Sequence, residues 1–140
     1  MKVLLIIICL ISSYGMSQNE ISWAVDYDNT GNELKFTAEL AEGWHIYSQF
    51  MDENAGPIPT SFEIIGEDIE ILGNVEEPEP TEVYDENFGS DIAYFSDEAV
   101  FTQKLKSGST GVVNIEIVYM LCNDEGCLPP TVSEFEIEIQ

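Results

Sequence analysis

Positive charge is what this sequence has least of. Four lysine or arginine residues stand against 27 aspartate and glutamate residues, which gives a formal net charge of −23. A surface of that sign repels nucleic-acid phosphates and anionic lipid headgroups, so it argues against both as partners. The acidic side chains are expected on a solvated outer face. A hydrophobic content of 44%, with 11% aromatic residues, is still enough to build a core and argues against a wholly disordered chain.

Histidine and cysteine are also scarce. The chain has one histidine, His45, and three cysteines, Cys9, Cys122 and Cys127. One histidine and the two cysteines near the C-terminus fall short of the four ligands that zinc usually takes. A lone histidine without a nucleophile-elbow motif gives little support to serine catalysis. We therefore expect neither a metal nor a cofactor.

The chain has one notable apolar run, Val3 to Ile11, and it is too short to span a bilayer. The run has the length of a signal-peptide core, and the small and polar residues of Ser12 to Ser17 follow it. Residues 1–17 are thus predicted to be a signal peptide, and residues 18–140 a single domain without a membrane span. Cys9 would leave with the peptide. Cys122 and Cys127 would remain in an oxidising compartment, where pairing is the default.

No stretch shows the 3.6-residue period of a helix over helical length. Short runs instead alternate apolar and polar residues with the period of half-buried strands. They lie at 21–27, 33–40, 43–47, 62–65, 69–72, 92–95, 100–105, 113–121 and 135–139. Short strands with turn signals about every ten residues predict an all-β sandwich. Asn74 to Ser90 is predicted to be the longest irregular stretch, and its exposed aromatic residues suggest that it covers something.

The segment from Tyr119 to Pro130 places a polar turn between Cys122 and Cys127. Asn, Asp and Gly in that turn suit a tight reversal. If the flanks pair as strands, the cysteines lie opposite each other with Cα atoms roughly 4.5 to 5.5 Å apart, within reach of a disulfide. The pair is either a structural staple or a redox couple. Closing so short a loop contributes only about 2 kcal/mol in the chain-entropy model, which argues mildly against the staple.

Three motifs in order carry a resemblance to a known family. They are Gly43-Trp-His-Ile-Tyr47, the Tyr84 to Gly89 loop, and Tyr119 to Pro130. Together they resemble the N-terminal domain of the DsbD thiol:disulfide interchange protein family, over nearly all of the mature chain. The resemblance implies an immunoglobulin-like sandwich of antiparallel strands with a long cap loop. It also implies export to the bacterial periplasm and a place in cytochrome c-type biogenesis.

The resemblance further implies partners and roles. The domain would take electrons from a membrane thiol reductase and pass them to thioredoxin-fold proteins through transient mixed disulfides. Cys127 would be the attacking thiol and Cys122 the resolving one. The residues placed around them are His45, Tyr47, Asp85, Glu86 and Phe88. Alignment on Gly89 puts Asn87 where the shielding ring of the cap is often found, so Asn87 and Phe88 both remain candidates for that position.

The predicted reaction is thiol–disulfide exchange, as a component of a protein-disulfide reductase. Thiolate is the nucleophile, and Asp124 and Glu125 in the turn oppose its formation, which predicts a reductant rather than an oxidase. The alternative is a secreted immunoglobulin-like binding module with a structural hairpin disulfide, because such sandwiches host many functions.

Overall fold

The computed structural model describes residues 19–140, and every regular element in that range is a β-strand. The strands pair antiparallel, so the all-β prediction is confirmed. No helix within these residues is long and apolar enough to cross a membrane. The predicted signal peptide, with Cys9, lies outside the described residues.

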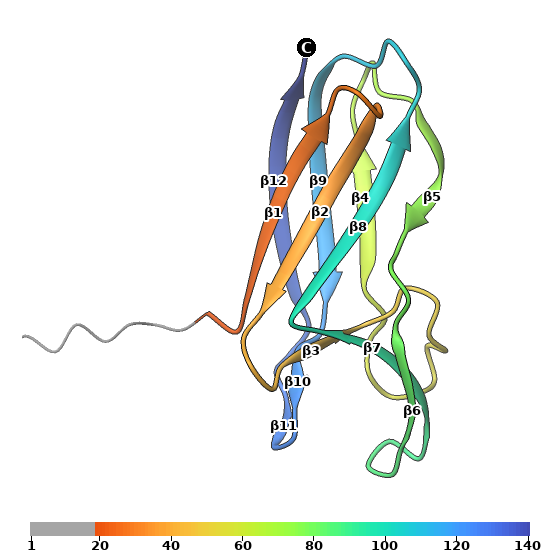
Figure 1. Ribbon diagram of the computed structural model, residues 1–140, viewed down its shortest axis with the longest axis vertical. Helices are drawn as coiled ribbons and strands as arrows, with labels where there is room; N and C mark the ends of the chain where they lie inside the picture. Colours follow the sequence, from red (N-terminus) through yellow and green to blue (C-terminus); the bar gives the residue numbers. More distant parts are fainter. Residues whose placement is uncertain (1–18) are drawn as a thin grey trace, which may run out of the picture.

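One layer of the sandwich is a four-stranded sheet in the order β1-β2-β8-β5 (Figure 1). Its strands are β1 (Ile21–Asp28), β2 (Glu33–Leu40), β8 (Glu98–Leu105) and β5 (Ile71–Glu76). Every second side chain of β2 is buried, namely those of Leu34, Phe36, Ala38 and Leu40. Because successive side chains of a strand point to opposite faces, this burial confirms the predicted alternation.

The opposite layer has three strands in the order β12-β9-β4. They are β12 (Thr131–Ile139), β9 (Gly111–Tyr119) and β4 (Ser61–Ile65). Between the layers the ring of Phe101 lies 5.1 to 6.0 Å, centroid to centroid, from the rings of Phe62, Phe95 and Trp23. Each fully buried side chain of this kind stabilises the fold by roughly 1.5–3 kcal/mol. The core therefore outweighs the contribution of a short hairpin disulfide.

A third sheet extends the sandwich at one end, in the order β11-β10-β3-β7-β6. Its strands are β3 (His45–Tyr47), β6 (Thr81–Asp85), β7 (Ser90–Ser96), β10 (Cys122–Asn123) and β11 (Gly126–Cys127). The β6–β7 and β10–β11 hairpins both project from this end, opposite to the C-terminus (Figure 1). The chain bends at Asp97, with φ 63°, where β7 passes into β8 of the four-stranded sheet. The two hairpins are thus anchored by strands of the sandwich itself.

The prediction of an irregular stretch from Asn74 to Ser90 is wrong for most of its length. β5 continues to Glu76 and β6 occupies Thr81–Asp85, so that only 77–80 and 86–89 lie outside strands. Pro78 and Pro80 fall between the two strands, where the chain leaves the edge of one sheet for the edge of another. The side chains of β6 are almost all exposed, so the strand lacks the alternation that would reveal it. The expected cap loop is consequently the tip of the β6–β7 hairpin.

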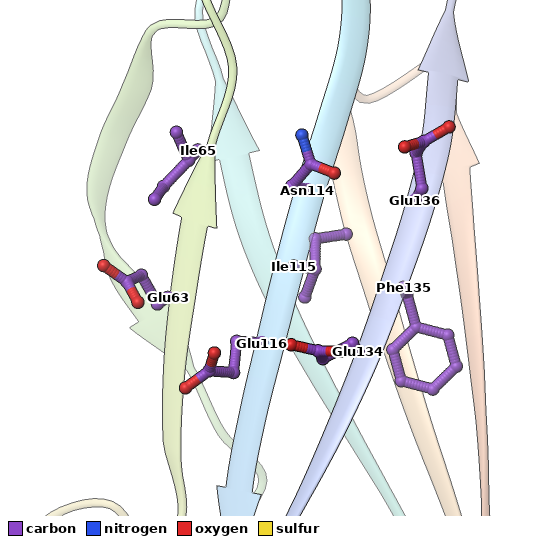
Figure 2. A pocket seen from close by; sticks show the side chains of 8 residues that line it. All are labelled: Glu63, Ile65, Asn114, Ile115, Glu116, Glu134, Phe135 and Glu136. Atoms are coloured by element: carbon purple, nitrogen blue, oxygen red, sulfur yellow. The ribbon is translucent and has the colours of Figure 1, made fainter.

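The outer face of the three-stranded sheet carries a row of glutamates (Figure 2). Glu116 of β9 pairs directly with Glu63 of β4 on one side and with Glu134 of β12 on the other. Figure 2 shows the three side chains on neighbouring strands of this sheet. This face agrees with the acidic, solvated surface expected from composition, and Cys122 and Cys127 lie on another sheet.

Glu116 lies between two like charges, and like charges directly opposite each other destabilise a sheet. We expect Glu116→Lys to raise the free energy of unfolding by about 1 kcal/mol at low salt. The gain should shrink at high salt, because screening weakens exposed pairs. Urea unfolding at two salt concentrations measures both effects. Glu138→Lys is the control, since Glu138 faces Val112 on the same surface. Equal gains in the free energy of unfolding in both variants would show that the effect comes from the net charge of the protein and not from the row of glutamates.

Candidate active site

The two cysteines close the β10–β11 hairpin as a disulfide. Cys122 and Cys127 lie opposite each other in antiparallel register, with Cα atoms 4.0 Å apart. Asn123 pairs with Gly126, which leaves a two-residue turn. The Asn123 side-chain oxygen accepts hydrogen bonds from the backbone N–H groups of Glu125 and Gly126, at 2.9 and 3.1 Å. This local turn brings the cysteines together, so the opposed register predicted from its chemistry is confirmed.

The two cysteines differ sharply in exposure. Cys122 is 2% exposed and belongs to a cluster of buried residues, which are Tyr47, Met51, Ala55 and Ile92. Cys127 is exposed on β11, the edge strand of its sheet. A protein that approaches this hairpin therefore meets Cys127 and not Cys122.

His45 lies beside the disulfide. It is opposite Cys122 in the β3–β10 pairing, so His45, Cys122 and Cys127 form one row across three strands and share a face of the sheet. The half-buried imidazole packs edge-on against the ring of Tyr47, with centroids 5.5 Å apart. It also packs against the ring of Tyr94 at 4.9 Å. The two tyrosines restrict the position of the imidazole in this row.

Burial shifts the pKa values of two side chains beside the cysteines. It lowers the pKa of His45 below the ordinary value, although the carboxylates of Asp124 and Asp85 act in the opposite direction. Burial also raises the pKa of Tyr47. The Tyr47 hydroxyl finds no hydrogen-bond partner within residues 19–140. An unpaired buried hydroxyl costs free energy.

The tip of the β6–β7 hairpin forms the other wall of the site. One carboxylate oxygen of Asp85 accepts hydrogen bonds from the backbone N–H groups of Asn87 and Phe88, at 2.8 and 3.1 Å. The Asp85 carbonyl accepts a third, from the N–H of Gly89 at 2.7 Å. The turn directs the Phe88 ring against the cluster that contains Cys122, whereas Asn87 is exposed. Phe88 and not Asn87 supplies the ring that packs here.

One hollow joins these parts. Its walls are His45, Tyr47, Asp85, Asn87, Phe88 and the hairpin from Cys122 to Cys127. Among the residues predicted to surround the cysteines, Glu86 is the exception, because it is exposed on the hairpin tip and does not line the hollow. Within residues 19–140 no three His, Cys, Asp or Glu side chains are grouped so that they could hold a metal ion. The hollow lies directly beside the Cys122–Cys127 disulfide.

The segment 48–60 provides the surface on which the cap packs, which we call the seat of the cap, although its sequence indicates only a loop. Gly56 has φ 118°, and a Cβ atom at that position would overlap the Phe88 ring. The Ser90 hydroxyl donates a hydrogen bond of 2.7 Å to the Ala55 carbonyl and ties the hairpin to the same segment. Gly56 is thus a position where the close approach of a ring requires glycine. Nothing in the local sequence identifies Phe88 as that neighbour.

Several solved structures share this fold. The N-terminal domain of Neisseria meningitidis DsbD in the reduced form matches with a TM-score of 0.65 at 18% identity, over 85% of each chain. The complex between the DsbD N-terminal and PilB N-terminal domains of the same organism gives a TM-score of 0.64 at 15% identity, over 83% of this chain and 80% of that chain. The N-terminal periplasmic domain of ScsB from Proteus mirabilis gives 0.55 at 19% identity, over 89% of this chain and 48% of that chain.

No protein with a curated description matches the chain. The family profile described as "Thiol:disulfide interchange protein DsbD, N-terminal" matches residues 16–139. This match takes in the aromatic pair at His45 and Tyr47, the cap hairpin and both cysteines, and the solved neighbours share the immunoglobulin-like sandwich that the three motifs implied. The chain belongs to the family of DsbD N-terminal domains.

Proposed function

We propose that this chain is a periplasmic thiol–disulfide exchange domain that relays reducing equivalents to thioredoxin-fold proteins through Cys122 and Cys127. The observation that carries the proposal is the asymmetry of the pair, with Cys127 exposed and Cys122 buried beside a hollow. A staple needs neither an exposed cysteine nor an adjoining hollow. Exchange needs an accessible sulfur and a second cysteine that completes the reaction. Family membership supports the same reading.

The exchange runs in two steps. The Cys127 thiolate attacks one sulfur of a partner's disulfide, and the other partner sulfur leaves as a thiolate. Cys122 then attacks the Cys127 sulfur, which forms the Cys122–Cys127 disulfide and releases the partner with both its cysteines reduced. Two electrons pass from this domain to the partner, and no cofactor is required. A membrane thiol reductase would restore the dithiol by the reverse route.

The partner would dock at the end of the domain that holds the two hairpins. The domain of the Neisseria relative is known in a complex with a PilB N-terminal domain, which makes direct docking of a protein partner reasonable for this chain too. Asp85 and Asp124 give the rim negative charge, so a partner with a basic rim would associate faster. Export by a signal peptide at residues 1–17 would bring the domain to the periplasm.

The reduction potential tests this function. Asp124 and Glu125 disfavour a thiolate beside them, which makes the dithiol less stable than that of a strong oxidant. We expect a potential more negative than about −180 mV. Equilibration in glutathione buffers, followed by alkylation of free thiols, measures it. The Asp124→Asn/Glu125→Gln double variant should be more oxidising than the wild type, and Glu86→Gln, away from the hollow, is the control.

A clearly more oxidising wild-type potential would refute the reductase function. A native protein whose disulfide never opens in mild reductant would instead be an immunoglobulin-like binding module with a structural hairpin disulfide.

A further inference from the structure

The only histidine of the chain lies in the row of the two cysteines. Register places its side chain on the same face as that of Cys122, directly across one strand pair, and both line the same hollow. Directly paired residues of an antiparallel sheet have Cβ atoms roughly 4.5–5.5 Å apart, which is within reach for an imidazole and a thiol. The position of His45 therefore raises the question of what it does when the cysteines are reduced.

The second step of the exchange needs Cys122 to lose a proton. Among residues 19–140, no lysine or arginine lines the hollow to stabilise a Cys122 thiolate. The lysines of residues 19–140 instead pair with carboxylates elsewhere, as Lys35 with Asp28, Lys104 with Glu76 and Lys106 with Glu70. The burial of Cys122 adds a desolvation cost to its charged form. A base close to the sulfur is therefore what the step requires.

Few other groups that face the row of His45, Cys122 and Cys127 could act as this base. The hairpin contributes Asp124 and Glu125, the cap contributes Asp85, and β3 and β7 contribute the phenols of Tyr47 and Tyr94. Carboxylates are weak bases at neutral pH, and neutral phenols have little basicity. A neutral imidazole is the side chain best matched to proton transfer near pH 7. Within this set, His45 alone meets the requirement.

We propose that His45 is the general base of the resolving step and takes the thiol proton of Cys122 as that sulfur attacks. This proposal rests on the proposed function, because it requires an exchangeable pair. The bond from Cys122 to Cys127 forms, the bond from Cys127 to the partner breaks, and the partner leaves as a thiolate. The imidazolium then gives its proton to solvent. In the reverse direction the imidazolium returns a proton to the departing Cys122 sulfur.

The surroundings of His45 suit this role. The imidazole packs against the rings of Tyr47 and Tyr94, so little freedom is left to lose when the proton moves. Burial keeps the pKa of His45 below its ordinary value of 6.5, so the imidazole is neutral and able to accept a proton at pH 7. Asp124 and Asp85 stabilise the imidazolium that forms.

A small neutral disulfide separates the two steps of the exchange. Reduced protein mixed with one equivalent of 4,4′-dithiodipyridine should release a first thiopyridone when Cys127 attacks, and a second when Cys122 resolves the mixed disulfide. The second release is intramolecular, so its rate does not depend on reagent concentration. At pH 7, His45→Phe should slow the second release relative to the first on the order of 100-fold. Ser96→Ala, on the other side of His45 in the same row, is the control.

The pH dependence provides a readout that a packing role would not change. A base is active only when unprotonated, so the wild-type second release should rise with pH through a titration below pH 6.5 and then level off. His45→Phe should lack that titration. Asp124→Asn should move it to lower pH, because Asp124 raises the proton affinity of His45.

Two results would each overturn the proposal. One is a His45→Phe variant that keeps the wild-type ratio of the two release rates. The other is a wild-type profile without the acid titration, which requires no variant and so no assumption about folding. The reagent replaces the partner protein, so either failure leaves the relay to thioredoxin-fold proteins untouched. Conversely, normal release together with no reduction of such partners would count against the relay and not against His45.

Discussion

Cys127→Ser should abolish disulfide exchange with a thioredoxin-fold partner, whereas Cys122→Ser should trap that partner as a stable mixed disulfide. The reason is access, because Cys127 is exposed on an edge strand and Cys122 is 2% exposed beneath it. Without Cys127 no reachable sulfur remains to attack. Without Cys122 the first step proceeds and the second cannot. Non-reducing electrophoresis and mass spectrometry of the reduced variants, mixed with an oxidised partner, distinguish the two outcomes.

The two serine variants control for each other. Each loses the same disulfide, and with it about 2 kcal/mol in the chain-entropy model. Cys122→Ser also places a hydroxyl in the buried cluster, so trapping of the partner by this variant cannot be the result of greater stability. Trapping by Cys127→Ser and loss of reaction in Cys122→Ser would reverse the assigned roles. Full exchange in either variant would show that the pair is not the redox centre.

Much of the fold could be predicted because burial imprints a period of two on the sequence. Leu34, Phe36 and Ala38 alternate with polar residues, and all three are fully buried in β2. The same reasoning failed for β6, since an exposed edge strand has no buried side and therefore no alternation. The prolines at 78 and 80 added to the appearance of a loop, although they lie just before the strand.

The site was predictable where its parts are local in the chain. Asn123 to Gly126 encode their own turn, which sets Cys122 opposite Cys127 whatever surrounds them. The difference in exposure between the two cysteines could not be predicted from the local sequence. Both cysteines flank the same turn, and only the packing around β10 buries one of them. The choice between Asn87 and Phe88 depended on hydrogen bonds to Asp85 that fix the turn. Alignment alone could not supply that geometry.

Gly56→Ala should open the cap. The Gly56 backbone has φ 118°, a conformation that L-residues rarely adopt, and the added Cβ would overlap the Phe88 ring. Backbone strain and overpacking together should lower the free energy of unfolding by roughly 2–4 kcal/mol. Because the Phe88 ring packs on the cluster that buries Cys122, its displacement should expose that cysteine. Iodoacetamide treatment of the reduced protein, with site-resolved mass spectrometry, should show faster labelling of Cys122 than in the wild type.

Two further variants separate strain from overlap. Gly111 has φ 102° with no atom near a Cβ built on it, so Gly111→Ala carries the backbone strain alone. Phe88→Ala removes the ring, and in the Gly56→Ala/Phe88→Ala double variant the overlap is gone while the strain remains. The two single effects should therefore sum to more than the effect of the double variant, which measures the coupling between ring and seat. If Gly56→Ala costs no more than Gly111→Ala and leaves Cys122 protected, the ring has another support. Strict additivity would also show that the ring has another support, because a Phe88 ring held by contact with Gly56 must respond to a side chain at that position.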